Sequence, residues 1–285
     1  MPSFFDPYDV GSSFFDLLRQ NRPDLVPQVQ LKLEGISRAE SQELMDAPRA
    51  TTILALKYRD GVVIAGDRQA TEGFQISSRR IEKVFKADDH SAIAIAGVAG
   101  PCIEMAKLFE VELVHYEKLE GMSLSLEGKA NKLSQMVKAN LPLAIQGLVV
   151  IPIFVGYDVR RGEGKIFKYD LTGGRYEETE YYATGSGGKE ARSAMKKLYR
   201  PDMAEDDAIA VALEGLIDAA EEDVGTGGPD FVRGIFPTVK LVVTAGLHDV
   251  AEARIREACQ VIVNLRANIQ REAGADGETQ AKRIK

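Results

Sequence analysis

The chain contains no tryptophan, and aromatic residues make up only 7% of its 285 residues. Base-stacking platforms and carbohydrate sites rely on aromatic side chains, so we expect neither. Basic residues are in the minority, at 36 against 43 acidic ones, and no cluster of Lys and Arg suited to phosphates is present. The composition therefore argues against a nucleic-acid partner.

Cysteine and histidine are equally scarce. Cys102 and Cys259 are far apart and each lies in an apolar stretch, which favours two buried thiols over the alternative of one disulfide. His90, His115 and His248 are isolated from one another, and no paired cysteine spacing indicates zinc. We predict no metal site and no cofactor.

Long apolar runs are absent too. No stretch of 18 apolar residues occurs, so the sequence predicts no membrane span. The first residues lack the basic segment followed by an apolar one that marks a secretory signal. We expect a cytoplasmic protein without a membrane partner.

Residues 1–50 differ in character from those that follow. Four phenylalanines are crowded into the first fifteen positions, prolines interrupt any long helix, and little of the rest could form a core. We interpret residues 1–50 as a leader that is removed on maturation and residues 51–271 as one domain. The polar residues 272–285 are expected to be a flexible tail.

Strand and helix patterns come in blocks. Apolar β-rich runs at 52–58 and 62–65 flank Asp60-Gly61, which predicts a hairpin with a type I′ turn. Further strands are expected at 81–85, 91–96, 149–157, 164–169, 176–183 and 238–244. Amphipathic helices are expected at 101–119, 126–148, 189–199, 205–223 and 255–269. Blocks of this kind favour an α+β fold, in which two stacked antiparallel sheets lie between helix layers as a four-layer αββα sandwich.

Common catalytic motifs are incomplete in this chain. The segment TGSGG at 184–188 misses the nucleophile elbow Gly-x-Ser-x-Gly by one position. Gly188-Lys189 is followed by Glu190, so it is not a phosphate-binding P-loop, and the third spaced glycine of a dinucleotide loop is missing. Neither a serine hydrolase elbow nor a nucleotide site is predicted.

Six motifs do agree, in order and spacing, with one known family. They are TTILALK from Thr51, GDR at 66–68, Lys83, Gly97, GSG at 185–187 and DVGTGG at 223–228. With these motifs the chain resembles proteasome beta subunits, closely over 51–245 and more loosely over the leader. The bacterial, actinobacterial branch is indicated by HYEKLEG at 115–121, by GGPD at 227–230 and IFPT at 235–238, and by SSFFDLLR at 12–19 in the leader.

The resemblance implies an N-terminal nucleophile hydrolase fold and a threonine endopeptidase whose nucleophile is Thr51. A threonine hydroxyl needs a base, and a free α-amine, which titrates at about 7.7–8.0, is far more often neutral near pH 7 than a lysine at about 10.4. Lys83 would lower the proton affinity of the nucleophile, and Asp67 would hold Lys83 in its charged form. The backbone N–H of Gly97 would donate to the oxyanion.

Two further groups of residues follow from the same register. Ser186, Asp223 and Thr226 match the residues that orient the amine and a proton-shuttling water. The specificity pocket would involve Ala70, Thr71, Ile81, Phe85, Ile95 and Ala99. No carboxylate or lysine is among these pocket residues, so we predict cleavage after hydrophobic residues.

Maturation and assembly are implied in the same way. The α-amine is released only if the bond between Ala50 and Thr51 is cut, with Thr51 itself as the attacking group. The family usually has glycine before the threonine, and the methyl group of Ala50 restricts the backbone there without forbidding cleavage. The expected particle has seven-membered beta rings, two of them stacked between alpha-subunit rings. An ATPase unfoldase would deliver polypeptide substrates through the alpha ring.

Other interpretations stay open at this point. The chain could be a non-catalytic, unprocessed proteasome-type scaffold, or an N-terminal-nucleophile amidase acting on small molecules. Taken singly, Asp67 and Lys83 fit a surface ion pair, Ser186 a turn residue and Asp223 a helix-end residue. A pure binding module would leave Thr51, Asp67 and Lys83 unexplained together.

Overall fold

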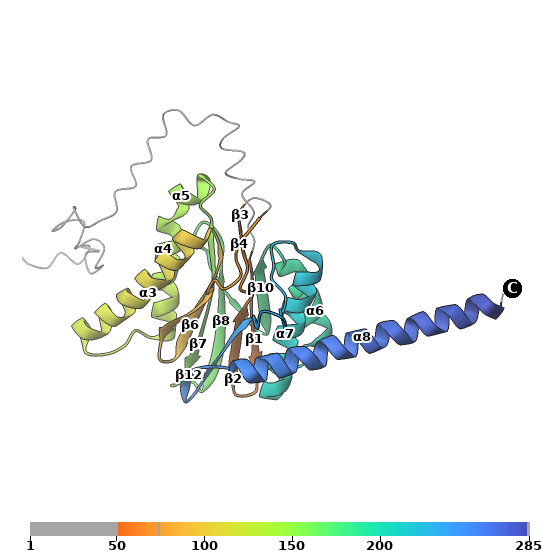
Figure 1. The fold of residues 1–285 in the computed structure, drawn as a ribbon. Coiled ribbons are helices and arrows are strands. Elements are labelled where there is room, and N and C mark those ends of the chain that lie inside the picture. Colours follow the sequence, from red (N-terminus) through yellow and green to blue (C-terminus); the bar gives the residue numbers. More distant parts are fainter. Residues whose placement is uncertain (1–50, 73–74, 284–285) are drawn as a thin grey trace, which may run out of the picture.

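The computed structural model of this chain describes residues 51–72 and 75–283. The expected leader, residues 1–50 with the Ala50 side of the cleavage site, lies outside the described residues. Two antiparallel sheets face each other, and helices cover the outer side of each (Figure 1). The predicted α+β sandwich is therefore confirmed.

The first sheet begins with the strand that follows Thr51. Its strand order is β10–β1–β2–β11–β12, and every neighbouring pair is antiparallel. Its members are β1 (Thr52–Tyr58), β2 (Gly61–Gly66), β10 (Tyr181–Gly185), β11 (Thr238–Val243) and β12 (Gly246–Asp249). Because β1 lies between β10 and β2, residues at the ends of all three strands meet around Thr51.

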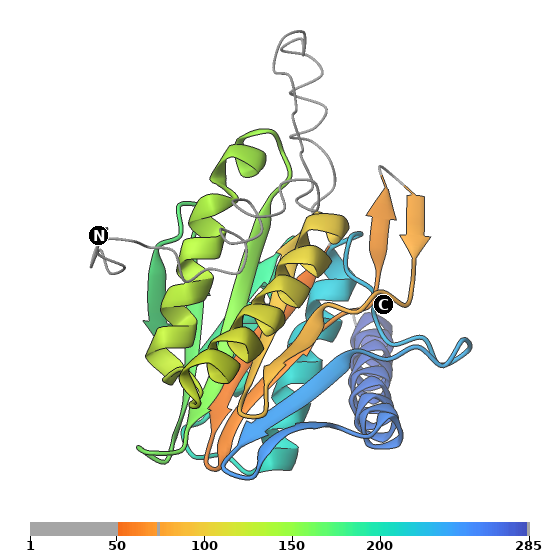
Figure 2. The ribbon, with the colours of Figure 1, turned by 90° about the vertical axis from the view of Figure 1, so that its left-hand side faces the viewer.

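The second sheet has the order β5–β6–β7–β8–β9, again antiparallel throughout. Its members are β5 (Val84–Asp88), β6 (Ser91–Gly97), β7 (Val150–Asp158), β8 (Glu163–Tyr169) and β9 (Arg175–Glu178). A separate small hairpin, β3 (Ala70–Glu72) with β4 (Gln75–Ser78), projects beyond the sheets in Figure 2. The sequence did not predict this hairpin or β12.

Helices form the two outer layers. On the second sheet lie α3 (Ala99–Glu120) and α4 (Leu126–Ala139), followed by the short α5 (Leu141–Ile145). On the first sheet lie α6 (Gly188–Leu198) and α7 (Glu205–Glu222), and α8 (Glu252–Arg283) packs along α7 before it projects from the body (Figure 1). No helix among the described residues is both long and apolar enough to cross a membrane.

Alternating side chains of the strands divide the core into three layers. In β1, Ile53 and Ala55 face the second sheet, whereas Leu54 and Leu56 face α6 and α7. This alternation follows from the two-residue period of a strand, with both faces apolar because both are covered. A third cluster, around Phe109, fills the space between the second sheet and its helices. Three clusters between four layers leave both sheets rigidly held.

Two expected elements are divided in the structure. The helix expected at 126–148 breaks at Asn140, because Pro142 suits the first turn of a new helix but not a helix interior. The strand expected at 176–183 is two strands, β9 and β10, which belong to different sheets. Its middle residues 177–180 are all polar and lack the alternate apolar positions that a continuous buried strand needs.

The structure also bears on the tail and on one turn. Helix α8 continues as far as Arg283, through most of the polar residues 272–285. That these residues form a flexible tail stays a prediction. The hairpin at Asp60-Gly61 is confirmed, but its turn is not type I′, which needs positive φ at both central residues. Within the described ranges, Asp202 is the only non-glycine residue with positive φ. Gly61 instead permits close approach, since a Cβ there would lie 2.2 Å from the Val242 carbonyl oxygen.

Candidate active site

Thr51 lies immediately before β1 and is buried. Its backbone N–H donates to Ser186 Oγ at 3.1 Å, and its carbonyl oxygen accepts from the Ser186 N–H at 2.9 Å. The preceding Gly185 has a φ of +102°, and a Cβ on it would lie 1.7 Å from the Thr51 carbonyl oxygen. Only glycine fits there, so the GSG motif is needed to bring the chain against Thr51.

Ser186 connects Thr51 to the carboxylate of Asp223. Ser186 Oγ and Thr226 Oγ1 both donate to Asp223 Oδ2, each at 2.5 Å. A hydroxyl has only one proton to donate, and Ser186 donates it to Asp223. Ser186 Oγ therefore acts as the acceptor for the Thr51 N–H. Asp223 caps α7, and the helix end therefore fixes where the carboxylate lies. Ser186, Asp223 and Thr226 are thus brought together as predicted.

Thr52 carries the network to the other side of Thr51. Its Oγ1 lies 2.7 Å from Thr226 Oγ1, and its backbone N–H donates to Asp67 Oδ1 at 2.9 Å. Since Thr226 gives its proton to Asp223, the Thr52 hydroxyl is the donor between the two threonines. This role of Thr52 was not predicted from the sequence, in which its only signal is the repeated threonine of the TT pair.

Asp67 follows β2 and is buried with a full set of donors. Oδ1 accepts from the Thr52 N–H and from Lys83 Nζ, the latter at 2.6 Å. Oδ2 accepts from the backbone N–H groups of Gln69 and Gly227, both at 2.9 Å. Four donors, one of them cationic, therefore satisfy both oxygens of this buried carboxylate.

Lys83 is the cation of this pair, and its side chain is only 5% exposed. Its Nζ also donates to the Gln69 carbonyl oxygen at 2.6 Å, so two of the three ammonium donors are used. Burial lowers the pKa of the Lys83 ammonium below its ordinary value, and Asp67 opposes that effect. The interpretation of Asp67 and Lys83 as a surface ion pair is therefore wrong.

Gly97 ends β6 just before the N-terminal cap of α3. Its φ of +137° and a hypothetical Cβ only 1.9 Å from the Val149 carbonyl oxygen make glycine necessary there. The nearby Ile95 N–H donates to the Lys83 carbonyl oxygen at 3.0 Å, which ties the end of β6 to the Lys83 segment. Gly97 itself lies outside the side-chain network formed by Thr51, Asp67 and Lys83.

The six expected pocket residues come from four segments around the end of the sandwich. Ile95 is buried in the core beneath α3, so it can contribute only the floor of a pocket. The other five keep partial exposure: Ala70, Thr71, Ile81, Phe85 and Ala99. Thr71 Oγ1 is buried without a hydrogen-bond partner among the described residues. Two cavities among the described residues, one beside Gln69 and one beside Met203, are lined by other residues.

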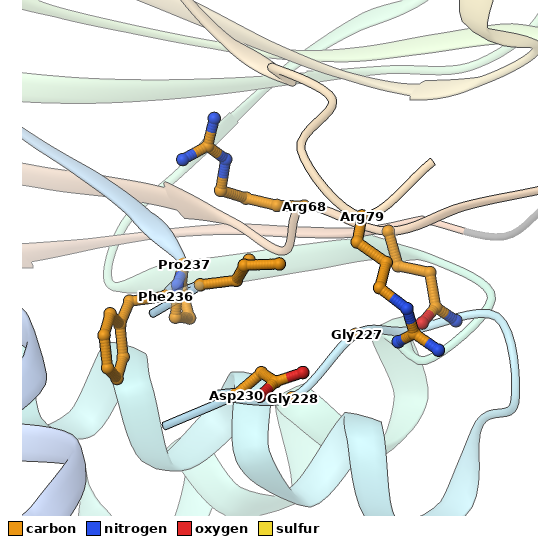
Figure 3. A pocket seen from close by; sticks show the side chains of 9 residues that line it. Arg68, Arg79, Gly227, Gly228, Asp230, Phe236 and Pro237 are labelled. Atoms are coloured by element: carbon orange, nitrogen blue, oxygen red, sulfur yellow. The ribbon is translucent and has the colours of Figure 1, made fainter. Parts of the chain in front are cut away.

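A small cavity lies beside the network. Its lining includes Gln69 and Gly227, which hold Asp67, together with Arg68, Arg79, Gly228, Asp230, Ile235, Phe236 and Pro237. Figure 3 shows the Arg79 side chain extending toward Gly227, while the Arg68 side chain points away from it. The two guanidinium groups do not converge on one point.

Neither cysteine joins the site as a reactive group. Cys102 and Cys259 are buried free thiols, as predicted, and burial raises the pKa of each to about 12. In the part of the chain that the structure describes, no group of three or more His, Cys, Asp or Glu side chains is placed to hold a metal ion. Around Thr51 the structure brings together two carboxylates, those of Asp67 and Asp223, and the buried ammonium of Lys83.

Comparison with known proteins gives consistent matches. The family model "Proteasome subunit" matches residues 47–232. The proteasome subunit beta of Acidimicrobium ferrooxidans is 50% identical over 254 residues, covering 89% of this chain and 90% of that protein. That of Jonesia denitrificans is 48% identical over 272 residues, covering 94% and 88%. That of Streptomyces griseus is 49% identical over 256 residues, covering 90% and 89%.

Proposed function

The chain belongs to the proteasome subunit family, among the beta subunits, and on this premise we propose that it is a catalytic threonine endopeptidase. The observation that supports the proposal most is the connection of Thr51 to two acidic centres. Ser186 links it to Asp223 on one side, and Thr52 links it to the Asp67–Lys83 pair on the other. A threonine with no chemical role would not need a buried ammonium and two carboxylates around it.

The reaction begins once Thr51 has a free α-amine. The neutral amine takes the proton of Thr51 Oγ, and Oγ attacks the carbonyl carbon of the peptide bond. The positive charge of Lys83 favours the developing alkoxide, and the Gly97 N–H donates to the oxyanion. The C–N bond then breaks, and the α-ammonium returns its proton to the leaving amine.

The second half of the reaction releases the acyl group. Water gives a proton to the α-amine and attacks the ester on Thr51 Oγ, the C–O bond breaks, and the proton returns to Oγ. Ser186 Oγ and Asp223 orient the amine through both steps, because the same oxygen that accepts from the Thr51 N–H remains its partner. Thr226 Oγ1 donates to the same carboxylate oxygen, Asp223 Oδ2, and so helps to fix its position.

Processing uses the same groups. While residue 50 is attached, the Thr51 nitrogen is an amide and cannot act as a base. Thr51 Oγ attacks the Ala50 carbonyl, the acyl group moves from nitrogen to oxygen, and water hydrolyses the resulting ester. Residues 1–50 leave, and the α-amine becomes free. The methyl group of Ala50 slows this step relative to glycine by restricting the backbone.

Specificity and assembly complete the proposal. The partly exposed pocket residues Ile81, Phe85 and Ala99 carry no charge, which favours hydrophobic residues before the cleaved bond. The beta subunits form heptameric rings, two of which stack between alpha-subunit rings. An ATPase unfoldase feeds unfolded polypeptides through the alpha ring, and the particle acts in the cytoplasm.

The test is intact-mass analysis of the particle assembled with its alpha subunit, combined with hydrolysis of a fluorogenic peptide ending in Tyr. We expect a beta subunit that begins at Thr51 and is active. Thr51→Ala should assemble, keep residues 1–50 and hydrolyse nothing, whereas Thr244→Ala, at an exposed turn after β11, should behave like the wild type. A wild-type subunit that keeps residues 1–50 under all conditions would refute processing and leave the scaffold interpretation. Hydrolysis by Thr51→Ala would refute the assigned nucleophile.

A further inference from the structure

The loop of residues 223–228 carries two groups of the network but has few anchors of its own. Asp223 and Thr226 lie on it, and Asp223 holds the loop internally through bonds to Gly225 and Thr226. The Val224 side chain is 90% exposed and packs against nothing that would fix its peptide group. Besides the side-chain bonds from Ser186 to Asp223 and between Thr52 and Thr226, bonds to the backbone of the loop hold it against the rest of the site.

Gln69 supplies one such contact. Its side-chain Nε2 donates to the Val224 carbonyl oxygen at 2.9 Å, and the residue is only 6% exposed. A carbonyl oxygen can only accept, so the amide nitrogen of Gln69 has to face it. The peptide that directly follows Asp223 is thereby fixed by a side chain from the segment after β2.

The backbone of the same residue serves the ion pair. The Gln69 N–H donates to Asp67 Oδ2, and its carbonyl oxygen accepts from Lys83 Nζ at 2.6 Å. A second bond, from the Gly227 N–H to Asp67 Oδ2, closes the link between the two segments. A Cβ on Gly227 would lie 2.7 Å from Gln69 Cβ, so glycine allows the loop to come this close.

We propose that Gln69 is a positioning residue that holds the 223–228 loop, and with it Asp223, in a fixed position relative to the Asp67–Lys83 pair. This inference rests on the proposed function, since Asp223 matters only if Ser186 and the Thr51 amine take part in hydrolysis. Of the two hydroxyl bonds to Asp223 Oδ2, the one from Ser186 Oγ joins the loop to another segment, so a shift of the loop lengthens that bond. Loss of the tether therefore lowers turnover rather than substrate binding.

Two variants of matched size separate the donor from the packing of the side chain. Gln69→Met keeps the length of the side chain and removes the donor, while Gln69→Glu also places a carboxylate against the Val224 carbonyl oxygen. Gln69→Arg restores a donor. Gln146→Met is the control, because Gln146 Nε2 also donates to a backbone carbonyl, that of Pro142, at 2.9 Å, and takes no part in the network around Thr51. All four are assembled into full particles, and particle size confirms assembly.

For Gln69→Met we expect kcat to fall about threefold to tenfold, the range that one hydrogen bond supplies, while KM stays within about twofold. In Gln69→Glu we expect kcat to fall further, by about tenfold or more, because the new carboxylate also repels the Val224 carbonyl oxygen. Gln69→Arg should recover most of kcat, and Gln146→Met should match the wild type. Hydrogen exchange should speed up at amides 223–228 in Gln69→Met but not in Gln146→Met.

The outcomes are distinct from those of the proposed function. An inactive, unprocessed wild-type particle refutes the function and, with it, the catalytic meaning of the tether. If the wild type is active and Gln69→Met has the same kcat, this inference is overturned and the proposed function is not. The same holds if kcat falls in Gln69→Met and Gln69→Arg does not restore it. Faster exchange at 223–228 without any change in kcat overturns it as well, because the loop would then move without consequence.

Discussion

Thr51 and Ser186 are bonded to each other in both directions, from the Thr51 N–H to Ser186 Oγ at 3.1 Å and from the Ser186 N–H to the Thr51 carbonyl oxygen at 2.9 Å. The first bond uses the nitrogen that would become an amine under the proposed processing, and the second uses a carbonyl that this step would leave unchanged. Thr51 is therefore held by the body of the domain on both sides of its Cα.

Gly185 makes this contact possible, and replacing it should be severe. In Gly185→Ala the added Cβ would lie 1.7 Å from the Thr51 carbonyl oxygen at a φ of +102°, so the strands must separate. We expect loss of peptide hydrolysis and a loss of stability of about 3 kcal/mol or more. Gly162→Ala is the control, because its φ is +68° but its Cβ would meet nothing within 4 Å. It should lose only about 1 kcal/mol and stay active. Urea unfolding and peptide hydrolysis measure both, and an active Gly185→Ala would contradict the geometry.

The buried ion pair should be asymmetric in its contribution to stability. Asp67→Ala removes the carboxylate that accepts from the Lys83 ammonium and from three backbone N–H groups. Lys83→Met leaves Asp67 with these three backbone donors. We expect about 3–5 kcal/mol of lost stability in the first case and less in the second.

The exposed pair of Lys86 and Asp89 is the control for that comparison. Lys86→Met and Asp89→Ala should each change the free energy of unfolding by less than about 1 kcal/mol. Urea unfolding of the four variants gives the order directly. A larger loss in Lys83→Met than in Asp67→Ala would show that the backbone donors do not hold the carboxylate.

The pH dependence of kcat/KM should be bell-shaped. Activity requires a neutral α-amine, so it rises with pH through about 7.7–8.0, the ordinary range of such a group. It also requires protonated Lys83, so it falls again as that ammonium loses its proton. Burial lowers the pKa of Lys83, which places the alkaline limb below 10.5.

Lys83→Arg identifies the alkaline limb. A guanidinium keeps its proton at these pH values, so the limb should disappear at a lower maximum rate, while the acidic limb stays. Lys86→Arg, at an exposed lysine, should leave the profile unchanged. An alkaline limb that persists in Lys83→Arg would assign it to another group.

Substrate preference should follow the apolar pocket. Peptides ending in Leu or Tyr should be cleaved faster than those ending in Arg or Glu. Ile81→Lys should raise the rate after Glu relative to Leu by about tenfold, which corresponds to roughly 1.4 kcal/mol of charge pairing. The same change at Ile76 on β4, an exposed residue outside the expected pocket, is the control. A wild-type preference for Glu, or an equal shift in both variants, would refute this pocket.

Much of the sandwich follows from local patterns. Successive side chains of β1 and β2 point to opposite faces of the sheet, and both sets are apolar, so both faces must be covered. The apolar stripe of α4 likewise requires a sheet beneath it. Patterns of this kind say nothing of which sheet a strand joins. The divided segment 176–183 shows this, since β9 and β10 are neighbours in sequence but pair with β8 and β1, respectively.

The order and spacing of short motifs supported a family resemblance, and that resemblance predicted that Thr51, Asp67, Lys83, Ser186 and Asp223 belong to one candidate site. Only the tertiary structure decided how they are held. The burial of Lys83, the need for glycine at 185 and the tether from Gln69 to Val224 all depend on contacts between segments more than 100 residues apart or on packing around them. Sequence motifs record which side chains are present, whereas burial and backbone approach are properties of the folded chain alone.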